Sequence, residues 1–298
     1  MKTSPSSLTL DSASLGGTYT LPGTSLTLQR MGYGAMQLAG KGVFGPPRDV
    51  DEALAVLKEV VATDINHIDT SDFYGPHVTN QLINQAIHPY PEGLTIVSKV
   101  GAVRPSDGSW KPALSPEDIT SAIHDNLRNL GLEALDVVNL RAGGIHEPSG
   151  ESITAPLKVL VELKRQGLIR HLGLSNVTPK QLAEAQAITD IVCIQNNYNL
   201  VHRHDDDFID DLAQQGIAYV PYFPLGGFTP LQCDELSKVA ASLDATPMQV
   251  ALAWLLHRSP NILLIPGTCS RGHLRENVKA ATLQLPTEAL AELDSIRR

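Results

Sequence analysis

Three side chains at the ends of two neighbouring expected strands could together deliver a proton to a substrate. Asp69 and Tyr74 lie at and just after the end of the apolar run Ile65–Asp69, and Lys99 lies near the end of the next run, Leu94–Val100. A free phenol has a pKa of about 10, and a nearby ammonium group stabilises the phenolate and lowers that pKa. We therefore expect Lys99 to tune Tyr74 as an acid-base group and Asp69 to keep Lys99 charged.

These strand ends belong to a repeated alternation of short apolar runs and helical segments that starts at Arg30 and contains eight units. The expected strands are Arg30–Met36, Ile65–Asp69, Leu94–Val100, Leu135–Leu140, Ile169–Leu174, Ile191–Gln195, Ile217–Pro221 and Ile262–Pro266. The expected helices are Val50–Ala62, Asn80–Ile87, Pro116–Leu130, Ala155–Gln166, Pro179–Ala187, Asp206–Gln214, Pro247–Leu256 and Arg271–Ala280. A cap residue followed by proline, as at Ser115-Pro116, marks three of the helix starts.

Eight such units predict an α/β fold of the (β/α)8 TIM-barrel type, although an open doubly wound sheet would give a similar string. A dinucleotide-binding open sheet requires Gly-x-Gly-x-x-Gly after its first strand, and Gly32-Tyr-Gly-Ala-Met-Gln37 does not fit that pattern. We also expect a hairpin over Thr18–Leu28 and extra helices at Leu231–Leu243 and Pro286–Ile296. Residues 1–17 are expected to form a flexible leader and residues 18–298 a single barrel domain.

Composition argues against several classes of partner. The formal net charge of −9 disfavours binding to nucleic acid or to an anionic membrane. The cysteines are odd in number and widely spaced, and no apolar run reaches the length of a membrane span, so we expect a cytoplasmic protein. His202-Arg-His-Asp-Asp-Asp207 could suggest a metal site, but its acids precede an expected helix and are expected to cap it. We expect no metal.

Several segments resemble the aldo-keto reductase family, from about Leu28 to the C-terminus. Ile68-Asp-Thr-Ser-Asp-Phe-Tyr-Gly75 is similar to the family signature Asp-Thr-Ala-x-x-Tyr-Gly, and Lys99 stands where the family lysine does. Gly173-Leu-Ser-Asn176 and Ile194-Gln-Asn-Asn-Tyr198 resemble its two segments that bind a carboxamide. The resemblance implies hydride transfer between a nicotinamide cofactor and a small carbonyl compound.

The resemblance also implies the residues of a cofactor site. Ser175, Asn176 and Gln195 would hold the nicotinamide carboxamide, and Tyr222 would stack on its ring. The remaining implied cofactor contacts are Gly34, Ala35, Met36, Asp69 and Gly267; Phe223, Pro224, Leu225 and Gly227 along the pyrophosphate; Thr268, Arg271 and Arg275 near a ribose 2′-phosphate; and Glu276 and Asn277 at the adenine. Because Gly267 stands where many members carry lysine, the two arginines favour NADPH here and NADH stays open.

One departure from the family concerns the catalytic histidine. Arg141, the residue directly after the expected strand Leu135–Leu140, stands where that histidine normally does. Arginine cannot relay a proton, but it is a permanent cation that could hold a substrate oxygen. This strand end resembles the bacterial members that reduce pyridoxal, which implies that a phenolate beside the aldehyde would lie against Arg141. Phe44, Tyr74 and Trp110 are expected to line the same substrate pocket, and His146 could reach it in place of the missing histidine.

An altered set of catalytic residues also allows a different function. The chain could be a nicotinamide-binding regulatory or scaffold protein, similar to the barrel subunits of potassium channels, with vestigial chemistry. The complete trio of Asp69, Tyr74 and Lys99 favours an enzyme. The sequence does not decide the oligomeric state, and a monomer is slightly preferred.

Overall fold

The computed structural model of the protein describes residues 15–144, 147–227 and 231–296. Most of the expected leader, residues 1–14, and the alternative histidine, His146, lie outside the described residues.

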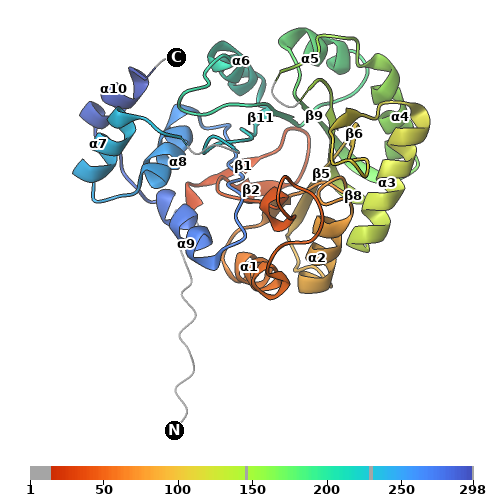
Figure 1. Ribbon diagram of the computed structural model, residues 1–298. Helices are drawn as coiled ribbons and strands as arrows, with labels where there is room; N and C mark the ends of the chain where they lie inside the picture. The colour runs from red at the N-terminus through yellow and green to blue at the C-terminus, as the bar shows by residue number, and fades with distance from the viewer. Residues whose placement is uncertain (1–14, 145–146, 228–230, 297–298) are drawn as a thin grey trace.

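A curved parallel sheet forms the centre of the molecule, with a ring of helices around it (Figure 1). The strand order is β11-β10-β9-β8-β5-β4-β3, so strands that follow one another through a helix lie side by side. Its members are β3 (Tyr33–Gly34), β4 (His67–Asp69), β5 (Thr95–Val100), β8 (Leu135–Arg141), β9 (Ile169–Ser175), β10 (Cys193–Gln195) and β11 (Ala218–Tyr219). Each lies within the expected strand or extends it by one residue.

Residues 262–267 close the sheet into a barrel. The Leu264 amide donates to the Arg30 carbonyl at 2.8 Å, and the Gly32 amide donates to the Leu264 carbonyl at 2.8 Å. On the other side, the Leu263 amide donates to the Tyr219 carbonyl at 2.9 Å. The eighth expected strand is therefore present as bridges to both edges of the sheet, and the (β/α)8 prediction is confirmed.

The helices that cover the barrel begin and end close to their predicted limits. They are α1 (Val50–Ala62), α2 (Val78–Ile87), α3 (Pro116–Leu130), α4 (Thr154–Arg165), α5 (Pro179–Gln186), α6 (Asp206–Gln215), α8 (Pro247–Arg258) and α9 (Arg271–Ala280). The expected extra helices are α7 (Asp234–Ser242) and α10 (Thr287–Asp294). Ser115 caps α3 by accepting a hydrogen bond from the Asp118 amide, and Thr178 and Thr246 form capping boxes at α5 and α8.

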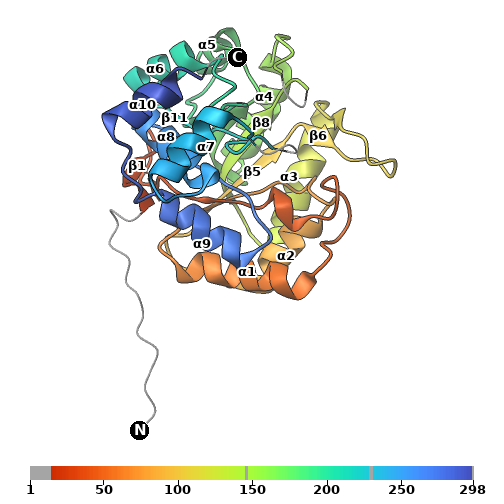
Figure 2. The same ribbon diagram turned by 60° about the vertical axis from the view of Figure 1, so that its left-hand side comes forward.

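Two hairpins lie outside the barrel sheet. The expected one pairs β1 (Thr18–Thr20) with β2 (Thr27–Gln29), and Leu21 and Leu28 pack with apolar side chains from the barrel interior. The second pairs β6 (Ala102–Val103) with β7 (Lys111–Pro112), a segment that the sequence suggested only as a loop. In Figure 2 this second hairpin projects from the side of the molecule.

The acids before α6 do not cap it as expected. Asp205 is the N-cap residue, but its side chain makes no capping hydrogen bond. Its carboxylate accepts instead from the Asn196 amide and from the Tyr219 hydroxyl, each at 2.8 Å. Burial explains the difference, because this carboxylate is only 8% exposed and meets side-chain donors from Asn196, the residue after β10, and from Tyr219 of β11.

No single helix among the described residues has both the length and the apolar composition to cross a membrane. The α7–α8 pair passes that test only when the two helices are taken together, and they meet at an angle of 93°.

Candidate active site

A pocket opens at the carboxyl ends of the barrel strands, the face where such barrels place reactive groups. It brings together many of the expected site residues. The residues lining it are Gly34, Met36, Gln37, Asp69, Phe73, Tyr74, Lys99, Trp110, Arg141, Gln195, Tyr222, Phe223, Pro224, Leu225, Gly227, Ile265, Pro266 and Gly267.

A buried ion pair lies in this pocket. The Lys99 ammonium donates to Asp69 Oδ1 at 2.6 Å and to the Thr70 carbonyl at 2.9 Å, and both charged side chains are about 5% exposed. The second carboxylate oxygen of Asp69 accepts from Gln195 Nε2 at 2.8 Å. Burial is the largest single effect on the pKa of Lys99 and lowers it, but the charges of Asp69 and Tyr74 and the hydrogen bonds to them together outweigh burial. The net pKa is therefore raised and the ammonium stays protonated.

The Tyr74 phenol lies beside this pair, with the Lys99 ammonium 5.1 Å from the centre of its ring. The expected net decrease in its pKa is not found. Burial raises the pKa of Tyr74 above the ordinary value, and the opposing effects of Lys99 and Arg141 do not cancel it. At 6% exposure the phenolate loses most of its hydration, and this loss of solvation free energy is larger than the stabilisation that the two cations provide. Tyr74 is therefore a protonated donor at neutral pH.

For the carbonyl reduction that the family resemblance implies, this direction of the Tyr74 pKa predicts different pH dependences in the two directions of the reaction. Carbonyl reduction uses the phenol, so its kcat should stay flat between about pH 6 and 9. Alcohol oxidation needs the phenolate, whose fraction below the pKa grows about tenfold per pH unit, so its kcat should rise across the same range. Benzyl alcohol, which does not ionise there, is a suitable probe. A plateau in its oxidation below pH 8 would contradict the raised pKa.

Arg141, at the end of β8, points into the same pocket. One guanidinium nitrogen donates to the Gly144 carbonyl at 2.6 Å and the other to Ser175 Oγ at 3.4 Å. The guanidinium lies 5.4 Å from the centre of the Tyr222 ring. The positive charge is thus held at the pocket wall and acts on both Tyr74 and Tyr222.

The residues expected at a nicotinamide lie together at the ends of β9 and β10. Asn176 donates to the Gly144 and Glu147 carbonyls at 2.8 Å each, and its oxygen accepts from the Tyr222 hydroxyl at 3.0 Å. Gln195 is fully buried, and its Oε1 has no hydrogen-bond partner among the described residues. A carboxamide NH2 group would satisfy this acceptor, so the residues present fit a nicotinamide.

The segment from Phe223 to Gly227 forms one wall of the pocket. Phe223 has a positive φ of 56°, and its ring lies where a Cβ on Gly227 would be, 2.6 Å from the nearest ring atom. Across the pocket, Gly34 and Gly267 form a bridge between the first strand and the closing segment, and a Cβ on Gly34 would lie 2.4 Å from the Ile265 carbonyl oxygen. Glycine at 34 and 227 therefore allows these close approaches of the Ile265 backbone and the Phe223 ring, which a Cβ would prevent.

Apart from Gly267, which lines the pocket, the residues expected in the loop and helix that hold a 2′-phosphate and adenine lie farther along, outside the pocket lining. Arg271 pairs with Glu52 of α1 at 3.0 Å, and Arg275 pairs with Glu59 at 2.6 Å. The Thr268 hydroxyl accepts from the Ser270 amide at 3.0 Å. The other three expected contacts lie at the pocket edge or on α9: Ala35 and Asn277 are buried, and the Glu276 carbonyl accepts from Gln249 at 3.3 Å.

Aromatic side chains form a wall that faces Tyr74. Two residues of this wall, Phe73 and Arg104, were not predicted from the sequence. Phe73 packs edge-on against Tyr74 and Trp110, with ring centres 5.3 and 5.8 Å apart. Arg104 stacks 3.9 Å from the Trp110 ring and donates to carbonyls in both adjoining loops. Phe44 also contacts Arg104, at 5.6 Å, but it does not line the pocket. The position of Phe73 beside Tyr74 in the signature was the available signal.

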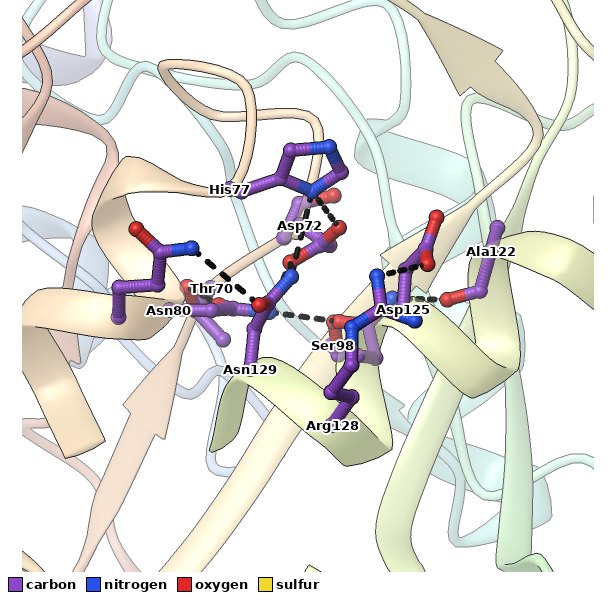
Figure 3. Close-up of polar contacts among 12 residues, drawn as sticks. Thr70, Asp72, His77, Asn80, Ser98, Ala122, Asp125, Arg128 and Asn129 are labelled. Atoms are coloured by element: carbon purple, nitrogen blue, oxygen red, sulfur yellow. Dashed lines mark hydrogen bonds and ion pairs between the residues drawn. The ribbon is translucent and has the colours of Figure 1, made fainter. Parts of the chain in front are cut away.

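One group of described side chains has the spacing of metal ligands. Oxygen or nitrogen atoms of Asp72, His77 and Asp125 lie within 4.8 Å of one another. However, Asn129 donates to Asp72 at 2.8 Å and Arg128 is paired with Asp125 (Figure 3). Protein donors and a cation therefore already engage both carboxylates, and the cluster is better described as a hydrogen-bond network.

Comparison with known proteins identifies the class. A profile of the aldo/keto reductase family matches residues 30–298. The chain is 64% identical over 283 residues to pyridoxine 4-dehydrogenase of Escherichia coli strain K12, covering 94% of this chain and 98% of that one. A thermostable aldo-keto reductase solved with the inhibitor epalrestat superposes with a TM-score of 0.79 at 30% identity, over 94% and 99% of the two chains. An aldo/keto reductase from Klebsiella pneumoniae in complex with NADP and acetate gives 0.76 at 23% identity, over 93% and 94%.

The chain therefore belongs to the aldo/keto reductase family, and it is an oxidoreductase.

Proposed function

We propose that the protein reduces an aldehyde to an alcohol with NADPH, and catalyses the reverse reaction, with pyridoxal and pyridoxine as the substrate pair. The observation that carries the proposal is the buried trio of Asp69, Lys99 and Tyr74 in a pocket at the carboxyl ends of the strands. The 64% identity to a pyridoxine 4-dehydrogenase over nearly the whole of both chains supports the substrate.

The residues of the chain supply the proton and the orientation. Tyr74, protonated at neutral pH, donates its hydroxyl proton to the carbonyl oxygen. Lys99 stabilises the phenolate that remains, and Asp69 holds Lys99 in place through its 2.6 Å contact. The aromatic side chains Phe73 and Trp110 exclude water from one side of the reacting carbon. The phenolate regains its proton from solvent, which completes the balance of one hydride and one proton for each aldehyde reduced.

We propose NADPH as the cofactor, with NADH use open, and it supplies the hydride when it is bound. Gln195, Asn176 and Ser175 would hold its carboxamide, and Tyr222 would lie against the ring. The orphaned Gln195 Oε1 supports this placement. Gly227 would border the pyrophosphate, and Arg271 and Arg275 would reach a 2′-phosphate by exchanging Glu52 and Glu59 for it.

Arg141 provides the test of substrate identity. Pyridoxal carries a phenolate next to its aldehyde, and a charge-assisted hydrogen bond to Arg141 is worth about 1.5–3 kcal/mol, or about 10- to 100-fold. We expect Arg141→Leu to lower kcat/KM by that factor for pyridoxal and by clearly less for benzaldehyde, which lacks the phenolate. NADPH oxidation measures both.

Two outcomes of these measurements would contradict the proposal. Equal losses for the two aldehydes would mean that Arg141 acts on the proton donor and not on the substrate phenolate. No turnover of pyridoxal by the unaltered enzyme, with turnover of benzaldehyde, would overturn the proposed substrate and leave the reductase chemistry in place.

The alternative of a regulatory nicotinamide-binding protein is not favoured. The E. coli relative, which this chain matches over 98% of its length, is named as an enzyme, pyridoxine 4-dehydrogenase. We further propose that residues 18–298 act as one catalytic domain, that the protein is a cytoplasmic monomer, and that its partners are small carbonyl compounds and not nucleic acid or membranes. The net charge of −9 supports the last point.

A further inference from the structure

A network of buried polar side chains lies behind the catalytic pair, on the outer face of the barrel sheet (Figure 3). Successive residues of a strand point to opposite faces, so Asp69 and Lys99 face the pocket while their neighbours Thr70 and Ser98 face the helices. Thr70 and Ser98 are fully buried there, as are Asn80 of α2 and Asn126 of α3, which complete the network.

The four side chains are joined by hydrogen bonds from one strand to the other. The Thr70 hydroxyl donates to Asn80 Oδ1 at 2.8 Å, and Asn80 Nδ2 donates to Asn126 Oδ1 at 2.9 Å. Ser98 donates to the same Asn126 oxygen, and Asn126 Nδ2 donates to the Ala122 carbonyl of α3 at 2.7 Å. The network therefore connects the residue after Asp69 with the residue before Lys99 through two helices.

The same network reaches the loop that carries Tyr74. Asn80 Nδ2 also donates to Asp72 Oδ1 at 3.2 Å, and Asp72 Oδ2 lies 2.6 Å from His77 Nδ1. His77 has a positive φ of 68°, at the point where the loop enters α2. In the sequence, Tyr74 thus lies between Asp72 and His77, whose side chains contact each other at 2.6 Å.

Main-chain contacts transmit this arrangement to the reacting groups. Lys99 Nζ donates to the Thr70 carbonyl at 2.9 Å, and the Ser71 hydroxyl donates to the Lys99 carbonyl at 3.0 Å. The Tyr74 amide donates to the Ser71 carbonyl at 3.1 Å. A shift of Thr70 would therefore move an acceptor of the Lys99 ammonium and the base of the Tyr74 loop together.

We propose that Thr70, Asn80, Ser98 and Asn126 are positioning residues, which fix the distance between the Lys99 ammonium and the Tyr74 hydroxyl from the outer face of the sheet. The proposal rests on the proposed function, because it assigns the network a role in proton transfer by Tyr74. It gives a reason for burying four polar side chains where apolar ones would pack at lower cost. Errors of about 1 Å in such a geometry lower rates by up to about 100-fold.

Thr70→Val is the sharpest test, since it removes the hydroxyl and keeps the shape. We expect kcat for aldehyde reduction to fall about tenfold or more, the KM for aldehyde and the Kd for NADPH to stay within about twofold, and the rise of alcohol oxidation with pH to move to higher pH. The charged groups around the Tyr74 hydroxyl are Asp69 on β4, Lys99 on β5 and Arg141 on β8, and the substitution removes none of these charges. Thr70→Ser keeps the hydroxyl and should restore kcat and the pH profile.

A matched control exists on the same helix pair. Thr79 of α2 is fully buried, and its hydroxyl has no hydrogen-bond partner among the described residues. Thr79→Val should therefore leave both kcat and the pH profile unchanged. Circular dichroism and NADPH fluorescence titration would establish that each variant is folded and binds cofactor equally.

A double variant separates the network from the proposed function. In a Tyr74→Phe background, Thr70→Val should cause no further loss of kcat, because the group it positions is gone. A Thr70→Val enzyme with unchanged kcat and pH profile would overturn the positioning role, as would an equal further loss in the Tyr74→Phe background. Failure of the unaltered protein to reduce any aldehyde would instead overturn the proposed function itself.

Discussion

Replacing Tyr74 with phenylalanine is expected to lower kcat for aldehyde reduction by about 10²- to 10⁴-fold, the usual contribution of a positioned general acid. Phenylalanine keeps the ring and its edge-on contact with Phe73, but it removes the hydroxyl next to Lys99. No other described neutral donor of the pocket combines this burial with a cation beside it. Steady-state oxidation of NADPH with pyridoxal and with benzaldehyde would measure the loss.

The loss in Tyr74→Phe should be confined to the chemical step. Tyr74 is not among the residues proposed to hold the cofactor, so the Kd for NADPH, measured by fluorescence, should remain within about twofold. Phe73→Leu is a suitable control, because it disturbs the same aromatic wall without removing a proton donor. If Tyr74→Phe retained more than about a tenth of the wild-type kcat, another group would have to supply the proton.

Replacing Lys99 with methionine is expected to destabilise the protein by about 3–5 kcal/mol, because it leaves the Asp69 carboxylate buried without its cation. Gln195 would remain as a neutral donor at 2.8 Å, which does not compensate the charge. The double variant Asp69→Asn/Lys99→Met removes both charges and should recover a large part of the loss. Urea denaturation followed by circular dichroism gives both free energies of unfolding.

An exposed lysine provides the control for this cost. Lys238 pairs with Glu292 at 2.9 Å, but its side chain is 76% exposed. Lys238→Met should leave the free energy of unfolding without a measurable change. Equal stabilities of the Lys99 and Lys238 variants would contradict the view that burial makes the Asp69–Lys99 pair essential to the fold.

Periodicity and helix-start chemistry predicted most of the fold. Eight apolar runs became strands or bridges, and three cap-proline signals marked helix starts to the residue, because local hydrogen bonds at Ser115, Thr178 and Thr246 fix those positions. The hairpin β6–β7 was missed because its strands are only two residues long and one contains a proline. The altered cap at Asp205 was missed because its partners come from other elements: Asn196 follows β10 and Tyr219 lies in β11.

The sequence predicted which residues lie together in the pocket, but it did not predict how buried they are or which partners they contact. The sign of the Tyr74 pKa shift depends on how much water is excluded, which composition does not reveal. The partners of Arg271 and Arg275 come from α1, over 200 residues away in the chain. The environment of His67 was not predicted either: neither ring nitrogen has a hydrogen-bond partner among the described residues, and burial lowers its pKa to about 4. Its ring occupies the space left by the missing side chain of Gly32.

In the proposed function, the pocket holding Asp69, Lys99 and Tyr74 carries out carbonyl reduction and does not merely bind a nicotinamide. The most direct test is a single-turnover experiment, in which enzyme saturated with NADPH is mixed with pyridoxal and the near-ultraviolet absorbance of NADPH is followed. We expect NADPH to be consumed and an equal amount of pyridoxine to be formed, at a rate about 100-fold or more above that of Tyr74→Phe with equal cofactor occupancy. Tight binding of NADPH without its consumption by pyridoxal or any other aldehyde would contradict it.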